Sequence, residues 1–144
     1  MLKDIINWDV VMTQPRTAGG HQEIMDKLFI NAEVLAKHVQ NDYQGELGYV
    51  YQLEDKRVVI TNDYFGSCSG CDAYEDSTDE QLRNLCIQLA NNSRTFENIP
   101  EAMNFLRSVK QDHAIYYDMR NVVTPLISEL YKNRVVKIDE ILND

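Results

Sequence analysis

The residues from Tyr64 to Asp72 are the densest group of chemically useful side chains in this chain. They read Tyr-Phe-Gly-Ser-Cys-Ser-Gly-Cys-Asp and combine two glycines, two serines, a Cys-x-x-Cys pair and an aspartate. A loop that only joins two elements tolerates almost any polar sequence. We therefore expect this segment, named here the cysteine loop, to have a specific role.

The spacing of its two cysteines is that of half a zinc site. Cys68 and Cys71 would supply two thiolates, whereas a structural zinc ion needs four ligands. Cys86 and His113 are the residues that would complete a Cys3His set. Cys86, however, falls in the apolar stripe of an expected helix, where cysteine usually packs as a small apolar side chain. A site for zinc or another divalent cation is therefore the less favoured interpretation.

Redox chemistry and phosphate binding both need positive charge beside the loop. Acids follow Cys71 instead, and they would raise the pKa of a thiol and so oppose thiolate formation. No lysine or arginine lies between Arg57 and Arg83, and no P-loop lysine follows the glycines. A phosphate would need a bridging cation such as magnesium. A metal-dependent or nucleotide-sequestering or nucleotide-processing protein, with its pocket at the cysteine loop, is the alternative hypothesis.

The acids around the loop favour binding to a positively charged protein. The chain has 14 basic and 23 acidic residues, a net charge of -9, which opposes direct binding of nucleic acid. Acidity also serves solubility alone. Aromatic side chains beside the acids would anchor a protein partner. We expect a basic protein, or one that itself binds nucleic acid, to contact Asp63, Tyr64, Phe65, Asp72, Tyr74, Glu75 and Asp76.

No residue is assigned a catalytic role. Gly-x-Ser-x-Gly, His-Glu-x-x-His and kinase signatures do not occur. The segment that contains Asp112, His113 and Asp118 would bring an acid and a base together as a pair if it is helical. A lone histidine beside an aspartate is more often a surface pair, and we expect His21 and His38 to be solvated. Binding is therefore favoured over catalysis.

The remaining sequence predicts an α+β fold in a single domain, residues 1–144. Alternating side chains over 47–53 and a β-rich run over 57–61, joined by Glu54-Asp55-Lys56, predict a hairpin of about residues 47–63. Ser77-Thr78-Asp79-Glu80 has the spacing of a capping box. An apolar stripe then predicts a helix from about 78 to 91. We expect a small antiparallel sheet packed with three to four helices.

The other elements follow from weaker patterns. Asn98 and Pro100 suggest the start of one helix, and Thr124-Pro125 suggests the start of another. Apolar spacing predicts a helix over residues 21–40. A strand is expected over residues 5–12, and an edge strand or the lead into a last helix over 135–138, whereas 112–123 is ambiguous.

Location and assembly are expectations of the same kind. No apolar run reaches the ~18 residues that span a bilayer, and the N-terminus lacks a signal-peptide core. The three cysteines are an odd number, which argues against a disulfide framework. We expect a cytoplasmic protein with no membrane partner, and self-association into a homo-oligomer is compatible with the sequence.

The cysteine loop, with Leu-Cys-Ile-Gln-Leu-Ala-Asn-Asn at 85–92, resembles a motif in small uncharacterised proteins of bacteriophages and their hosts. The resemblance covers about residues 47 to 92. It implies neither an activity nor a set of functional residues. It suggests a context, the cytoplasm of a bacterial host, and a role as a phage-type inhibitor of a host or defence protein.

Overall fold

A four-stranded antiparallel sheet forms the centre of the described structure. The computed structural model describes residues 1–16, 21–39, 45–65, 74, 76–112, 119, 121–133 and 135. The strands pair in their sequence order, which is β1 (Glu33–Val39), β2 (Gly45–Gln52), β3 (Val58–Phe65) and β4 (Arg94–Phe96). The predicted α+β class and antiparallel sheet are confirmed.

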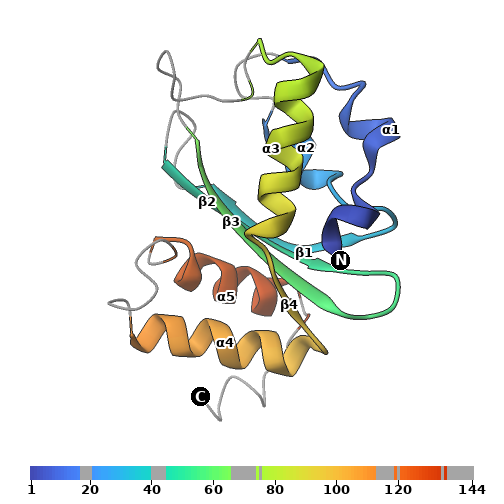
Figure 1. Cartoon of the computed structure of the whole chain (residues 1–144). Helices are drawn as coiled ribbons and strands as arrows, with labels where there is room; N and C mark the ends of the chain where they lie inside the picture. Colours follow the sequence, from blue (N-terminus) through green and yellow to red (C-terminus); the bar gives the residue numbers. More distant parts are fainter. Residues whose placement is uncertain are drawn as a thin grey trace.

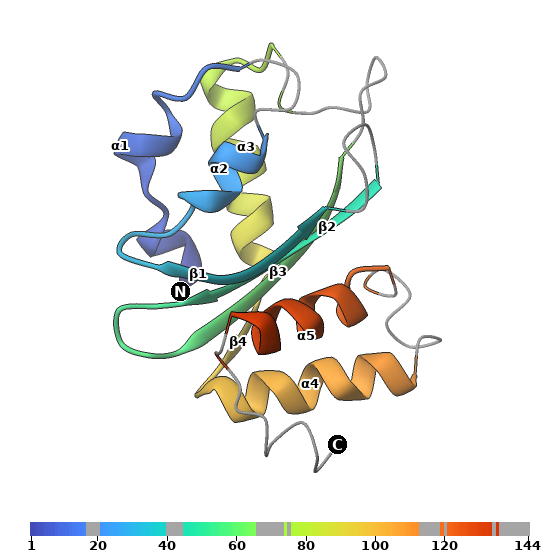
Figure 2. The same ribbon diagram turned by 180° about the vertical axis from the view of Figure 1, so that it is seen from behind.

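Helices cover both faces of the sheet (Figure 1, Figure 2). One face carries the 3₁₀ helix η1 (Leu2–Ile5) and the helices α1 (Trp8–Val11), α2 (His21–Asp26) and α3 (Asp79–Asn91). The other face carries α4 (Ile99–Gln111) and α5 (Val123–Lys132). The sheet therefore separates two helical layers.

Each face of the sheet has its own apolar core, because successive side chains of a strand point to opposite faces. Along β2, Leu47, Tyr49 and Tyr51 enter the cluster that contains the buried residues of α1, α2 and α3. Val50 enters the second cluster, with the buried residues of α4 and α5. The alternation that is visible in the sequence is thus used to build both cores.

The predicted hairpin is confirmed. β2 and β3 pair in register from Gly45 with Phe65 to Gln52 with Val58. Asp55 fixes the turn, because its carboxylate accepts hydrogen bonds from the backbone N–H of Arg57 at 3.1 Å and from its Nε at 2.8 Å.

Helix α3 is confirmed, with its capping box one residue later than predicted. Thr78 Oγ1 accepts from the N–H of Gln81 at 3.1 Å, and Thr78 N–H donates to Gln81 Oε1 at 2.9 Å. Both Ser77 with Glu80 and Thr78 with Gln81 have the spacing of a capping box. Ser77 is buried, and its carbonyl accepts a hydrogen bond from Arg16, so the cap falls on the exposed Thr78.

Helix α4 begins where the sequence indicated, because Asn98 Oδ1 accepts from the N–H of Glu101 at 2.9 Å. Helix α5 lies close to β2. A Cβ at Gly48 would lie 2.9 Å from Leu126 Cδ1 and 3.1 Å from Val122 Cγ2. The missing side chain at Gly48 therefore allows this close approach.

The predicted helix over residues 21–40 is wrong beyond Asp26. The chain leaves α2 and turns at Asn31, whose φ of 55° is one that asparagine adopts more readily than most residues. Strand β1 follows, and its register shifts between Val34 and Ala36. This bulge places Leu35 and Ala36 in succession at buried positions, so the strand loses its simple alternation.

The predicted strand over residues 5–12 is also wrong. Only Ile6 forms a β-bridge, to Phe29, and the chain then enters α1 at Trp8. The apolar residues of this segment pack it on the sheet as a short helical turn, because Ile6 and Val11 are buried in the first core. The expectations for Asp112–Asp118 and 135–138 fall mostly on residues outside those described.

Candidate functional site

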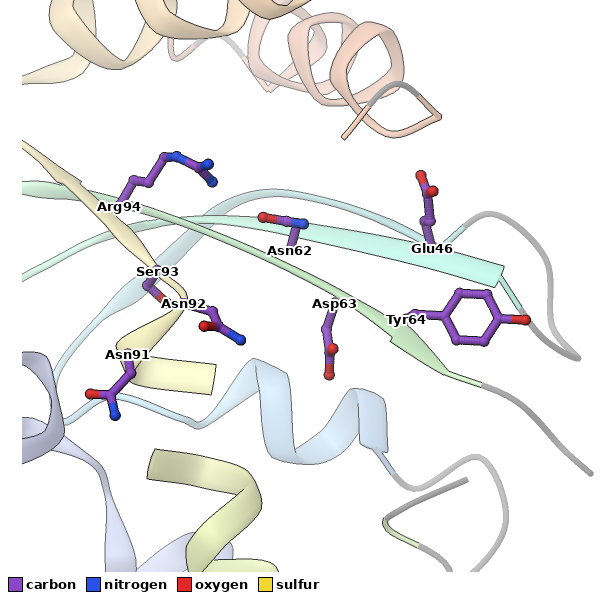
Figure 3. Close-up of a pocket in the computed structure, with 8 residues that line it drawn as sticks. All are labelled: Glu46, Asn62, Asp63, Tyr64, Asn91, Asn92, Ser93 and Arg94. Atoms are coloured by element: carbon purple, nitrogen blue, oxygen red, sulfur yellow. The ribbon is translucent and has the colours of Figure 1, made fainter. Parts of the chain in front are cut away.

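A polar cleft lies beside the end of β3 (Figure 3). Strand β4 pairs only with Val58, Val59 and Ile60, whereas β3 continues to Phe65. The space next to this continuation has a volume of about 730 Å³. We name it the edge cleft, and it is lined by Glu46, Asn62, Asp63, Tyr64, Asn91, Asn92, Ser93 and Arg94.

The inner end of the edge cleft is fixed by two hydroxyl groups. Ser93 Oγ donates to the carbonyl of Leu89 at 2.7 Å, in the last turn of α3. Thr61 Oγ1 lies 2.6 Å from Ser93 Oγ. Because the single hydroxyl proton of Ser93 is directed to Leu89, Thr61 must be the donor in this pair. The bonds join the end of α3 to β3 at the point where the chain enters β4.

Side chains of β3 enter the cleft from two sides of the sheet. Asp63 is opposite Leu47 in the register and points toward the layer of α2 and α3 (Figure 3). Asn62 is opposite Gly48 and points toward α5. The two groups of polar side chains are therefore separated by the strand.

The side that faces α5 contains both signs of charge. Arg94 and Glu46 point to this side (Figure 3). The guanidinium of Arg94 lies over the ring of Phe105, 5.2 Å from its centroid, and its Nη1 is 3.8 Å from Met119 Sδ. The charge of Arg94 is thus held toward α4 and away from Asp63.

The side that faces α3 contains the carboxylate of Asp63 and the amides of Asn91 and Asn92. Burial raises the pKa of Asp63 above its ordinary value of 3.8, and a hydrogen bond from the backbone of Tyr64 partly opposes this shift. Within the described part of the chain, no lysine, arginine or histidine forms an ion pair with Asp63. Asp63 is therefore a partly desolvated carboxylate without a cation of its own among these residues.

Tyr64 follows Asp63 in β3 and is 58% exposed, so an aromatic side chain stands at the mouth of the edge cleft. Of the predicted partner-binding residues, the structure thus brings Asp63 and Tyr64 together. Sequence reasoning missed the residues from β2 and from the α3–β4 junction. The Asn-Asn pair at 91–92 was visible in the sequence, but its position beside β3 depends on strand pairing.

Tyr74 was predicted to contact a partner, but it is buried in the first core at 1% exposure. Its hydroxyl donates to the carbonyl of Pro15. It holds the residues just before α3 against the segment that precedes α2. We therefore leave Tyr74 out of the proposed partner surface.

The acids at the start of α3 form a separate group from those of the edge cleft. Asp76 is exposed, and Asp79 forms an ion pair with Arg16 at 2.7 Å. Arg16 also donates to the carbonyl of Ser77 at 3.0 Å. One carboxylate of the acidic stretch is thus neutralised within the chain, and Asp76, Asp79 and Glu80 do not line the edge cleft.

Of the predicted metal ligands, the structure describes Cys86 alone. It is buried in the first core, and burial raises the pKa of its thiol to about 11. Among the described residues, no three His, Cys, Asp or Glu side chains are grouped so as to hold a metal ion. Five other residues predicted to bind a metal or a partner lie outside the described residues, namely Cys68, Cys71, Asp72, Glu75 and His113. The side chain of Phe65 is also not described.

Comparison with known proteins gives no relative: no family model, curated protein or solved structure matches this chain. Of the helices that the structure describes, none is long and apolar enough to cross a membrane. The function is therefore argued from the geometry and charge of the edge cleft.

Proposed function

We propose that this protein binds a basic partner protein, with the edge cleft as the contact site and Asp63 as its main anionic group. The observation that carries the proposal is the carboxylate of Asp63, which is partly buried and has no ion pair with a described residue. Burial disfavours the charged form of a carboxyl group, and a nearby opposite charge favours it. A lysine or arginine of the partner would supply that charge.

The chemistry around Asp63 suits a cationic side chain. The amides of Asn91 and Asn92 lie on the same side of the sheet, and their oxygens can accept further hydrogen bonds from an ammonium or guanidinium group. Charge-assisted hydrogen bonds are about twice as strong as neutral ones. Arg94 does not compete for this position, because it is held over Phe105.

The charge of the whole chain supports the same class of partner. A net charge of -9 speeds the approach of a basic protein at low salt and slows that of an acidic one. The resemblance of the cysteine loop to phage proteins adds a context, in which the partner is a basic host or defence protein that is blocked on binding. A partner that normally binds nucleic acid would have the required surface.

A small polar ligand, such as a nucleotide, is the second candidate. It is favoured by the cleft volume of about 730 Å³, which lies within the range of small-molecule sites. Such sites are, however, usually lined by apolar and aromatic side chains, and Tyr64 is the one aromatic residue lining this cleft. A protein partner accounts better for a polar, acidic and open site.

The test compares two variants with the same net charge. Asp63→Asn removes the carboxylate of the edge cleft, and Glu80→Gln removes an exposed carboxylate at the opposite end of α3. Immobilised wild-type protein and both variants are used to capture proteins from a bacterial lysate at low salt, with quantification by mass spectrometry. We expect Asp63→Asn alone to lose a basic protein that the wild type captures.

Equal loss in both variants would mean that only net charge is recognised, and equal retention would mean that Asp63 is not the contact. Either result contradicts the proposal. A nucleotide that co-purifies with the wild type, in place of a protein, would favour the second candidate. Unfolding curves of the three proteins control for loss of structure.

A further inference from the structure

The two edges of the described sheet differ in how far they are protected. At β1 the edge is interrupted by the bulge between Val34 and Ala36. Asn133 Nδ2 also donates to the carbonyl of Leu35 at 2.9 Å. Bulges and polar side chains are common protections of edge strands. At the other edge, β4 pairs with only the first three residues of β3, and among the described strands none pairs with the outer side of residues 61–65.

We propose that the partner docks by strand addition: an extended basic segment pairs with the outer edge of β3 at residues 61–65, antiparallel to β3 and in line with β4. This inference rests on the proposed function and specifies how the edge cleft is used. Strand addition to an open sheet edge is a common way of binding peptides, in which main-chain bonds give affinity and alternate side chains give specificity.

The position of the guest strand follows from the existing register. Ile60 pairs with Arg94, and Thr61 is linked to Ser93 through the hydroxyl groups that are 2.6 Å apart. The residues that precede Ser93 belong to the end of α3 and lie outside the plane of the strands. Among the described strands, none pairs with the outer side of Asp63, and the guest strand is placed opposite this residue. Alternate residues of β3 direct their N–H and C=O groups to this side.

The side chains that the guest would need follow from the alternation along β3. A guest residue opposite Asp63 points to the same side of the sheet as Asp63, where Asn91 and Asn92 also lie. Lysine or arginine fits that position. The guest residues beside it point to the side of Asn62 and Tyr64, where a β-branched side chain would pack on the exposed ring of Tyr64.

Charge decides between a basic segment and a second copy of this chain. If two copies paired through this edge, each would bring Asp63 and a net charge of -9 to the contact. Like charges that face each other across a strand pair are destabilising. The basic segment of another protein provides the opposite charge.

The experiment uses a probe with this pattern, the peptide Thr-Lys-Val-Arg-Val-Lys-Thr, and two N-methylated forms of it. In one form the basic residues carry the N-methyl groups, and in the other the valines carry them. Each form blocks a single edge of the extended peptide and keeps its charge. Binding is measured by fluorescence anisotropy, and amide exchange of residues 61–65 is measured by NMR.

We expect the unmodified peptide to slow amide exchange at alternate residues of 61–65. One N-methylated form should bind about tenfold or more weakly and the other nearly normally, since only one edge loses its main-chain bonds. Asp63→Asn should weaken the unmodified peptide about tenfold, and Glu80→Gln should change its affinity little.

Binding that depends on Asp63 but is unaffected, or equally affected, by the two N-methyl patterns would overturn strand addition and leave the proposed function in place. If no amide of residues 61–65 is protected at about 1 mM peptide, where even weak binding is measurable, strand addition is also overturned. If lysate capture is then insensitive to Asp63→Asn as well, the proposed function fails with it.

Discussion

The hydroxyl pair of Thr61 and Ser93 should contribute to stability in a strongly non-additive way. Thr61→Val removes one hydrogen bond, with a net loss of about 1 kcal/mol. Ser93 then keeps its bond to the carbonyl of Leu89 at 2.7 Å, and its oxygen lies at the edge cleft, where water can reach it. Thr61→Val is therefore the milder change.

Ser93→Ala should cost more than Thr61→Val. It removes both bonds of Ser93, and it leaves the hydroxyl of Thr61 without an acceptor at 0% exposure. Two lost bonds and a buried donor give an expected loss of about 2–3 kcal/mol. In the double variant no hydroxyl is left without a partner, so its loss should be about 2 kcal/mol, smaller than the two single losses together by about 1–2 kcal/mol.

Urea denaturation of the wild type and the three variants, with the slope m compared between them, measures these free energies. Thr61→Ser keeps the donor and is the matched control. The assignment of donor and acceptor would be refuted if Thr61→Val cost more than Ser93→Ala, or if the two single losses were additive.

Three other predictions test the packing and the charges. Gly48→Ala should lower the free energy of unfolding by about 1–3 kcal/mol in urea denaturation, because its Cβ would lie 2.9 Å from Leu126 Cδ1; an unchanged stability would mean that α5 does not pack this closely. Because the pKa of Asp63 is raised in the folded state, the folded protein still holds this proton at pH values where the unfolded chain, with its ordinary pKa of 3.8, has released it. The free energy of unfolding should therefore fall as pH rises from the unfolded-state pKa to the folded-state pKa of Asp63. Asp63→Asn should lack this fall and be at least as stable as wild type at neutral pH, which thermal unfolding at several pH values checks, whereas lower stability there would contradict the burial argument. Arg16→Ala should lower the free energy of unfolding by about 1–2 kcal/mol, because it breaks the 2.7 Å ion pair between Asp79 and the Arg16 side chain, which is only 19% exposed. The melting temperature of this variant should be below that of the wild type, and an equal or higher Tm would contradict the prediction.

Local signals were sufficient for part of the fold. The hairpin follows from strict alternation and a polar turn, and Asp55 makes the turn bonds that such a sequence favours. Helices α3 and α4 follow from an apolar stripe with a cap at Thr78 and at Asn98. In these segments the local preference and the tertiary packing agree, so the pattern and the structure coincide.

Prediction failed where tertiary contacts decide against the local pattern. Residues 21–40 contain apolar residues at helical spacing, but the chain reverses at Asn31 and the bulge in β1 removes the alternation that indicates a strand. Of the partner-binding residues predicted around the cysteine loop, Asp63 and Tyr64 line the edge cleft. Their neighbours at 91–94 come next to them only through the pairing of β3 with β4, which no local pattern encodes.

The β2–β3 hairpin has a consequence for folding kinetics, because it lies between the two apolar cores. Its strands are joined by a short turn, so its formation closes little chain and is fast compared with the docking of distant segments. Neither helical layer has its complete apolar surface to dock on until the hairpin exists. Substitutions in the hairpin should therefore slow refolding, and those in the outer helices should mainly speed unfolding.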